Sequence, residues 1–453
     1  MIVHVSACQH GPELVKDGAQ CLNPIDRSIR CIDLVARQLG YPGIGTQMLV
    51  WLEGRADAAA LRRAIARLGN YYPVMTSRLI ETDRQGRPYW RFRPGAACRL
   101  AETRLPSDDP QAVLERAADI LSAGPDPTAA DPLDFHLLHR PDGKDVFLLQ
   151  YNHVLMDNRA AVPLLREIER LSPRRPAAPL LSEPGDLVWE HLRQFPRERR
   201  REVAQAAAEL QTRVFRGRAA TLLPIAPPPT GPARLEIVSR RLDARSSSVL
   251  RGRIVALCGF PCISMAVLGS AFRAIDRLGP PDDSRQHFAA GIGIPIPANG
   301  QAALVFQNVT SAISLRVGRE DLLHRDRLTR LLSDQLRQRL ADGVDLGILG
   351  MAAAFSRRYR YVEWAVWHLV HYAYSLWFGY FGSLEAVGKS FCGSAIEDLF
   401  HTGGPIWPSI ALSLLVNQYG GHLNFQATYD ARLIPPPLAE AFLDFLLADL
   451  IAE

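Results

Sequence analysis

Apolar residues follow two patterns along the chain, short continuous runs and helical spacing. Residues 146–151 form a short run rich in aliphatic and aromatic side chains, bounded by the turn-like residues 141–144, and they predict a buried strand. Residues 160–168 follow after a brief polar break and have the spacing of a helix. The chain around residue 153 is therefore expected to run strand, loop, helix.

Proline-rich stretches divide the rest of the chain. Connectors are expected at residues 172–185 and 223–232, and a charged helix interrupted at Pro196 lies between them. A chain of 453 residues is also long for one hydrophobic core. We expect an N-terminal subdomain over 1–185, a bridging helix and linker over 186–234, and a C-terminal subdomain over 235–453.

The loop between the predicted strand and helix carries His153 at the strand end and Asp157 four residues later. It is the one His-x-x-x-Asp spacing among the twelve histidines of the chain. A neutral imidazole titrates near working pH, so it can take a proton from a substrate and return it to a leaving group. We therefore predict that His153 is a catalytic base.

This strand, His-x-x-x-Asp loop and helix resemble the active-site segment of the acyltransferase superfamily that contains chloramphenicol acetyltransferase, condensation domains of peptide synthetases, plant acyltransferases and wax ester synthases. The resemblance implies that His153 is the base and that Asp157 holds the loop through an ion pair with an arginine. Asn152 replaces the first histidine of the family pattern, and Asn158 replaces its glycine. Asparagine is the residue after glycine that best adopts left-handed geometry.

Other segments resemble the family in the same order along the chain. The first half offers an opening turn at 22–26, a first strand at 48–54 and the end of a first helix at 72–79. Later, residues 291–297 and 306–311 resemble the features before and on the strand that crosses between the halves, and residues 381–384 and 412–425 resemble the last strands. The resemblance implies an α/β fold of two chloramphenicol acetyltransferase-like subdomains. Each would be a mixed sheet with flanking helices, and a tunnel would run between them.

The implied activity is transfer of an acyl group from a thioester to an alcohol or amine, with no bound cofactor. Acyl-CoA or a phosphopantetheinyl acyl carrier protein would be the co-substrate. The residues expected to bind substrate are Tyr151, Asn152, Asn308, Ser311, Trp367 and Trp377. Thr310 is a further candidate, with Asn308 and Ser311, to donate a hydrogen bond to the oxyanion. Two alternatives stay open: a free-standing condensation enzyme for carrier-bound units, and a non-catalytic member that binds a lipid or partner.

Composition narrows the classes of partner and compartment. The net charge of +5 is spread along the chain without a zinc or RNA-binding motif, so no nucleic-acid partner is expected, and an acidic carrier protein or CoA phosphate is compatible. The seven cysteines lack the paired spacing of a zinc site, so no metal is expected. Reduced cysteines indicate a cytoplasmic protein.

Residues 364–384 carry no Asp, Glu, Lys or Arg and are long enough to span a bilayer. Their histidines, tyrosines and glycines favour a buried or interfacial helix that runs into a strand. Peripheral membrane contact through their aromatic residues is an alternative. We expect Trp367 and Trp377 to line a core or the wall of a substrate tunnel.

Overall fold

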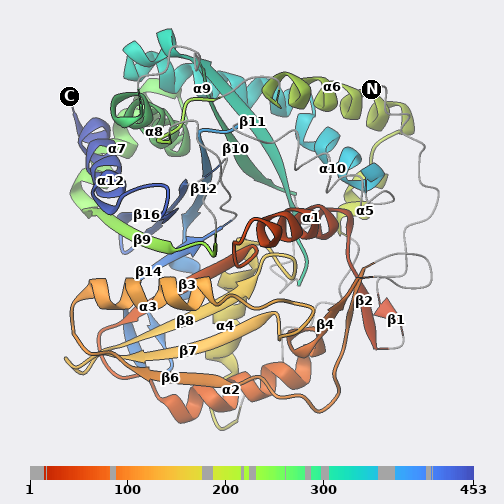
Figure 1. The fold of residues 1–453 in the computed structure, drawn as a ribbon, viewed down its shortest axis with the longest axis vertical. Helices are drawn as coiled ribbons and strands as arrows, with labels where there is room; N and C mark the ends of the chain where they lie inside the picture. Colours follow the sequence, from red (N-terminus) through yellow and green to blue (C-terminus); the bar gives the residue numbers. More distant parts are fainter. Residues whose placement is uncertain are drawn as a thin grey trace.

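The computed structural model describes residues 15–16, 18–81, 88–175, 187–215, 219–223, 231–260, 262–280, 287–296, 306–355, 373–404, 410 and 412–452. Two six-stranded sheets organise these residues, one in each half of the molecule (Figure 1). Both sheets combine parallel and antiparallel pairs and have helices packed beside them. The predicted α/β architecture of two mixed sheets with flanking helices is confirmed.

The N-terminal sheet has the order β13-β14-β3-β8-β7-β6. Its strands are β3 (Gly45–Leu52), β6 (Leu100–Arg104), β7 (Leu133–His139), β8 (Asp145–Asn152), β13 (Ser390–Phe391) and β14 (Ser394–Gly403). A smaller sheet beside it is built from β1 (Val15–Lys16), β2 (Ala19–Cys21), β4 (Arg78–Ile80) and β5 (Tyr89–Arg91).

The C-terminal sheet has the order β11-β10-β12-β15-β16-β9. Its strands are β9 (Leu235–Leu242), β10 (His287–Pro295), β11 (Thr310–Gly318), β12 (Leu376–Ser383), β15 (Leu412–Tyr419) and β16 (His422–Asp430). β11 lies at the edge of this sheet and pairs with β10 along its whole length.

In chain order, the helices before β9 are α1 (Pro24–Gln38), α2 (Ala58–Tyr71), η1 (Pro73–Thr76), α3 (Pro110–Ser122), η2 (Asn158–Ala160), α4 (Ala161–Leu171), α5 (Leu187–Arg193) and α6 (Arg197–Phe215). Those after β9 are α7 (Ala244–Cys258), α8 (Ile263–Leu278), η3 (Arg319–Leu323), α9 (Arg325–Ala341), α10 (Val344–Phe355), η5 (Glu385–Val387) and α12 (Pro436–Ile451).

The strand predicted before His153 is β8, and it is buried along its whole length because helices cover both faces of its sheet. Successive side chains of a strand point to opposite faces. Val146 and Leu148 accordingly join a core cluster with α3, whereas Phe147 and Leu149 join another with α2 and α4. The continuous apolar run therefore reports a strand between two layers of helices, which brings His153 to its end in a fixed position.

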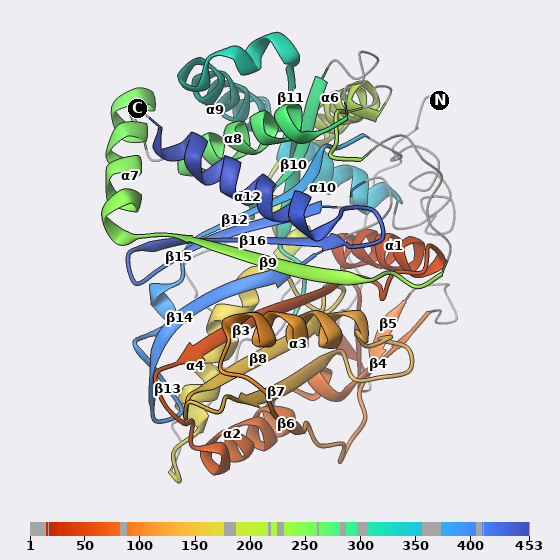
Figure 2. The same cartoon turned by 60° about the vertical axis from the view of Figure 1, so that its left-hand side comes forward.

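β14 connects the two halves. Although it lies late in the chain, it pairs antiparallel with β3 of the N-terminal sheet, and Figure 2 shows it running between β9 and β3. The prediction that residues 306–311 belong to the crossing strand is wrong, since they lead into β11 at the outer edge of the C-terminal sheet. Residues 390–403, which the sequence placed in the C-terminal half, thus complete the N-terminal sheet.

The uncharged stretch 364–384 is described from residue 373 onward, and Trp367 lies outside the described residues. Its described part contains β12, a strand inside the C-terminal sheet, where Phe378 is buried. Within the described ranges no single helix is both long and apolar enough to cross a membrane, and only α7 and α8, bent by 99° to each other, reach that length and composition together.

Candidate functional site

His153 follows β8 directly and stands where α1 and the segment before β11 meet the N-terminal sheet. Its backbone N–H donates to the carbonyl of Ile44 at 2.9 Å, which fixes the first residue of the loop beside the start of β3. Its carbonyl accepts from the Asn308 side chain at 2.8 Å. The loop is therefore held from both halves of the molecule, and α1 lies between these halves in Figure 1.

Asp157 closes the loop through both of its carboxylate oxygens. Oδ1 accepts from the backbone N–H groups of Arg159 and Ala160, at 3.1 and 3.3 Å, and so caps η2. Oδ2 accepts from the N–H of Val309 at 3.2 Å and from the Thr310 hydroxyl at 2.8 Å. In the described part of the chain no arginine pairs with this carboxylate, so the arginine partner expected from the family resemblance is replaced by hydrogen-bond donors at the start of β11.

A second set of hydrogen bonds joins the start of α1 to the segment before β11. Asn23 caps α1 and forms a capping box with Asp26, the local pattern that makes the helix begin there. Asp26 Oδ1 then accepts from both the backbone N–H and the side-chain amide of Asn308, at 2.7 and 2.9 Å. The Asn308 amide thus bridges the His153 carbonyl and Asp26, which lies 282 positions before Asn308 in the sequence.

The imidazole of His153 is in a state that suits a base. Burial lowers the pKa of His153, while its own backbone, the Asp157 carboxylate and the Asn308 side chain act in the opposite direction. The ring is therefore neutral at pH 7. Nδ1 is enclosed and has no hydrogen-bond partner among the described residues, and the same holds for Asn308 Oδ1. By elimination, Nε2 is the ring nitrogen open to a substrate.

Tyr151 and Asn152 are predicted to line the acceptor channel; in the structure both side chains are held inside the loop, and a contact with substrate stays a prediction for each. Tyr151 is completely buried, and its hydroxyl donates to Asn158 Oδ1 at 2.6 Å. The Asn152 side chain is also buried, accepting from the N–H of Val154 at 2.9 Å and donating to Asp33 at 3.3 Å. Both side chains hold the shape of the loop.

Asn158, which replaces the glycine of the family pattern, does not need left-handed backbone geometry here. It is the first residue of η2, and among the described residues Cys392 is the one non-glycine residue with a positive φ. The carbonyl of Asn158 instead pairs with a histidine, as described below. The substitution is therefore compatible with an intact loop.

Asn308, Thr310 and Ser311 were predicted to supply a hydrogen bond to the oxyanion. In the structure their side-chain donor groups already have acceptors, and a role at the oxyanion stays a prediction for all three. Asn308 donates to Asp26 and His153, and Thr310 donates to Asp157. Ser311 is buried, and its hydroxyl donates to the carbonyl of Asp345 at 2.7 Å. These residues position the loop and α10.

His401 is a site residue that the sequence did not reveal. It lies on β14, is completely buried, and its Nε2 is 3.1 Å from the Asn158 carbonyl, which lets Nε2 donate. Burial lowers its pKa to about 4, so the ring is neutral at pH 7. Its ring also packs on Phe381, with centroids 4.5 Å apart. An isolated histidine inside a predicted strand gives no local signal of such a contact.

Trp377 lies on β12 and is partly buried against a cluster that contains Ala289, Tyr374 and Ile410. Its contacts are those of a side chain at the edge of a core. A role in the wall of a substrate tunnel stays a prediction for Trp377, as it does for Trp367.

No protein-family model matches this chain, and no curated protein matches its sequence. Solved structures do match. The first condensation domain of the calcium-dependent antibiotic synthetase, in complex with a substrate analogue, aligns with a TM-score of 0.69 at 16% identity, covering 94% of this chain and 96% of that one. Trichothecene 15-O-acetyltransferase from Fusarium sporotrichioides aligns with a TM-score of 0.69 at 12% identity, covering 95% of both chains.

A cyclization-docking bidomain of a peptide synthetase from Sorangium cellulosum aligns with a TM-score of 0.67 at 14% identity, covering 95% of this chain and 85% of that one. Identities this low establish the fold and leave the reaction to be argued from the site. The resemblance drawn from the histidine loop extends to the architecture of the whole chain. The chain has the fold of condensation domains and of the acyltransferases related to them.

Proposed function

We propose that the protein transfers an acyl group from a thioester to an alcohol or amine, with His153 as the general base. The observation that carries this proposal is the state of the imidazole. Burial favours its neutral form, and its loop is fixed by Asp157 and Asn308. The similarity in fold to condensation domains and to an acetyltransferase supports the same reaction class.

The proposed reaction needs one proton carrier. His153 Nε2 takes the proton from the acceptor O–H or N–H as the oxygen or nitrogen bonds to the thioester carbonyl carbon. The tetrahedral intermediate then collapses, its C–S bond breaks, and the imidazolium returns the proton to the departing thiolate. No acyl-enzyme forms and no bound cofactor takes part. Asp157 shares no proton, because both of its oxygens are occupied in holding the loop.

The donor is proposed to be an acyl-CoA or an acyl group on a phosphopantetheinyl carrier protein. The second donor corresponds to a free-standing condensation enzyme that joins carrier-bound units. The similarity to condensation domains of peptide synthetases favours this second candidate. The two candidates share the base and the thioester chemistry, and they differ in whether the protein recognises a carrier.

A non-catalytic binding protein was the third hypothesis, motivated by Asn152 and Asn158. Their contacts argue against it, because Asn152 caps the turn after β8 and Asn158 accepts from Tyr151 while its carbonyl pairs with His401. Both asparagines thus preserve the loop that holds the base.

The test is an assay of thiol release. Purified protein is incubated with acetyl-, medium- and long-chain CoA thioesters and with the matching acyl carrier proteins, each with a panel of alcohols and amines. We expect acceptor-dependent thiol release that is lost in His153→Ala. Release with carrier-bound donors alone would select the condensation enzyme. Release that is the same in His153→Ala would contradict the proposed mechanism.

A further inference from the structure

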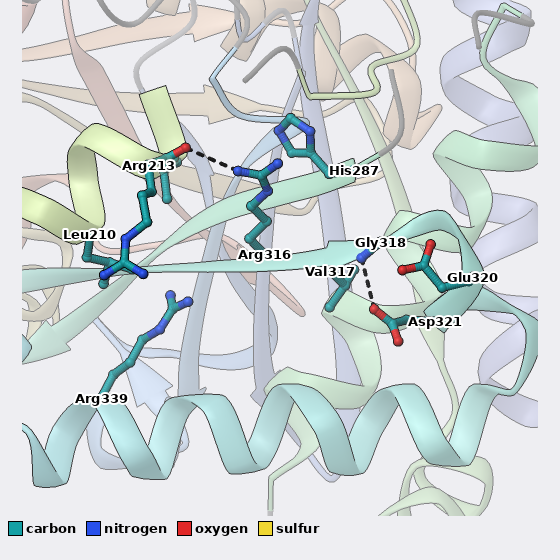
Figure 3. A pocket seen from close by; sticks show the side chains of 10 residues that line it. Leu210, Arg213, His287, Arg316, Val317, Gly318, Glu320, Asp321 and Arg339 are labelled. Atoms are coloured by element: carbon teal, nitrogen blue, oxygen red, sulfur yellow. Dashed lines mark hydrogen bonds between the residues drawn. The ribbon is translucent and has the colours of Figure 1, made fainter. Parts of the chain in front are cut away.

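A cavity in the C-terminal half lies away from the His153 loop. It has a volume of about 510 Å³ and opens between α6, the end of β11 and α9 (Figure 3). Its polar lining comes from separate elements: Arg213 on α6, His287 on β10, Arg316 on β11 and Arg339 on α9. None of these residues contributes to the loop, so the cavity needs its own explanation.

The arginines of this cavity lack acidic partners. In the described ranges no carboxylate forms an ion pair with Arg213, Arg316 or Arg339. Arg316 donates to the backbone carbonyl of Arg213 at 3.1 Å, which leaves its charge uncompensated. Arg339 has an enclosed Nη1 without a partner in the described structure. Figure 3 shows the guanidinium groups of Arg213 and Arg339 pointing toward each other. Like charges brought together in this way favour a bound anion.

His287 adds an unpaired donor or acceptor at the same place. Its side chain is only 7% exposed, and Nε2 is enclosed with no hydrogen-bond partner among the residues described. Burial and the nearby Arg316 lower the pKa of His287 to about 4, so the ring is neutral at pH 7 and can donate one hydrogen bond without adding charge. An enclosed polar atom left unpaired is destabilising, and a ligand that pairs with it would remove this penalty.

Carboxylates occur at the other end of the cavity. Asp321 accepts from the N–H of Gly318 at 2.9 Å and is occupied in that turn. Glu320 lies beside it, and Figure 3 shows both acids on the side away from Arg213 and Arg339. The cavity is therefore polarised, with an arginine-lined end where an anion is favoured.

We propose that the arginine-lined end of this cavity binds a phosphate-class anion. The planar guanidinium group presents paired N–H donors that match phosphate oxygens, and such charge-assisted hydrogen bonds are among the strongest in proteins. Arg213 and Arg339, whose guanidinium groups point toward each other, hold the anion, and Arg316 and His287 line the same cavity beside them. From Thr310, which contacts Asp157, to Arg316 the strand rises by about 20 Å, so this site is distinct from the base. It does not depend on acyl transfer.

The test is calorimetric titration of the full chain with sodium pyrophosphate at low ionic strength. We expect saturable binding that weakens by about tenfold or more in Arg339→Gln. Arg213→Gln, on the exposed side of α6, should have the same effect without disturbing the fold. The matched control is Arg330→Gln, which removes an exposed arginine from the same helix as Arg339 and should bind like the wild type.

Two ligands identify the source of the phosphate. Displacement of pyrophosphate by CoA assigns the site to the nucleotide of a CoA thioester, whereas binding without displacement by CoA assigns it to a separate phosphorylated ligand. The absence of saturable pyrophosphate binding, or equal binding in Arg339→Gln, Arg213→Gln and Arg330→Gln, would overturn the proposal. Because the readout is binding, this result is independent of whether the protein transfers acyl groups.

Discussion

The two ends of β11 differ in how their polar groups are paired. At its start, Thr310 and the preceding Asn308 donate to Asp157, Asp26 and the His153 carbonyl, so the groups that hold the loop are occupied. At its far end, His287 and Arg339 retain enclosed nitrogen atoms without partners among the described residues. The hydrogen bonds at the start of β11 fix the geometry of the loop, whereas the unpaired nitrogen atoms at its far end can still bind a ligand.

The same distinction applies within the loop. Around His153 the supporting side chains are paired, while the imidazole Nδ1 has no partner in the described structure and Nε2 is open. The donor groups of the residues that maintain the loop have acceptors, although Asn308 Oδ1 is unpaired among the described residues, and the imidazole that acts on the substrate keeps Nε2 for it. This contrast predicts which substitutions impair chemistry and which impair stability.

The largest effect is expected for His153→Ala. Removal of a general base lowers turnover by about 10²–10⁴-fold, and the partly exposed ring contributes little to folding. Thiol release and the thermal unfolding midpoint measure the two quantities separately. His422→Ala, on the β15–β16 hairpin, is the control and should retain activity. If His153→Ala lost its fold together with its activity, the distinction between residues that act on the substrate and residues that stabilise the loop would be contradicted.

Asp157→Ala, unlike His153→Ala, is expected to reduce the free energy of unfolding as its main effect. It leaves the N–H of Val309 and the Thr310 hydroxyl without their acceptor, which costs about 2–3 kcal/mol of unfolding free energy. Denaturant unfolding measures this loss, with Asp334→Ala, an exposed carboxylate on α9, as control. A normally stable Asp157→Ala protein with no activity would indicate that Asp157 takes part in the chemistry.

The parts of this account that follow from sequence are local. The apolar run at 146–151, bounded by a Pro-Asp-Gly turn, predicts β8, and the helical spacing after residue 160 predicts α4. The position of His153 at a strand end follows from these two elements. The two-sheet fold followed from the order of family-like segments.

The parts that did not follow depend on contacts between distant segments. Asp26 and Asn308 meet because α1 packs between the halves, and His401 reaches the loop because β14 joins the N-terminal sheet. Hydrophobic periodicity reports which face of an element is buried, but it does not report the element it packs against. For this reason the sequence did not reveal the internal hydrogen bonds of Tyr151, Asn152 and Ser311.

His136 offers a further comparison, because both of its enclosed ring nitrogens lack partners in the described structure, yet it does not line the cavity between α6, β11 and α9. Burial lowers its pKa to about 4. The unfolded chain binds its proton near pH 6.5, so stability present above that pH is lost as pH falls toward 4. We expect His136→Phe to recover about 1–2 kcal/mol at the acid end, measured by denaturant unfolding across this range. Equal acid sensitivity in both proteins would contradict this.

The smallest effect is expected for Trp377→Ala. If Trp377 contributes an apolar wall to the substrate path, its loss raises KM several-fold, by roughly 1 kcal/mol of binding, and changes kcat little. Rates across CoA thioesters of different chain length measure this change. Unchanged chain-length preference would make Trp377 an ordinary core residue of β12.

The pH dependence of kcat/KM for thiol release tests the central claim most directly, because it reports the ionisation of the free enzyme's base. Burial lowers the pKa of His153, so the neutral form already predominates below pH 6.5. The account predicts that the rate falls as pH decreases through a single ionisation below 6.5, and that this acid limb disappears from the residual rate of His153→Ala. A limb above 6.5, or one that persists unchanged in His153→Ala, would contradict the assignment of His153 as the base.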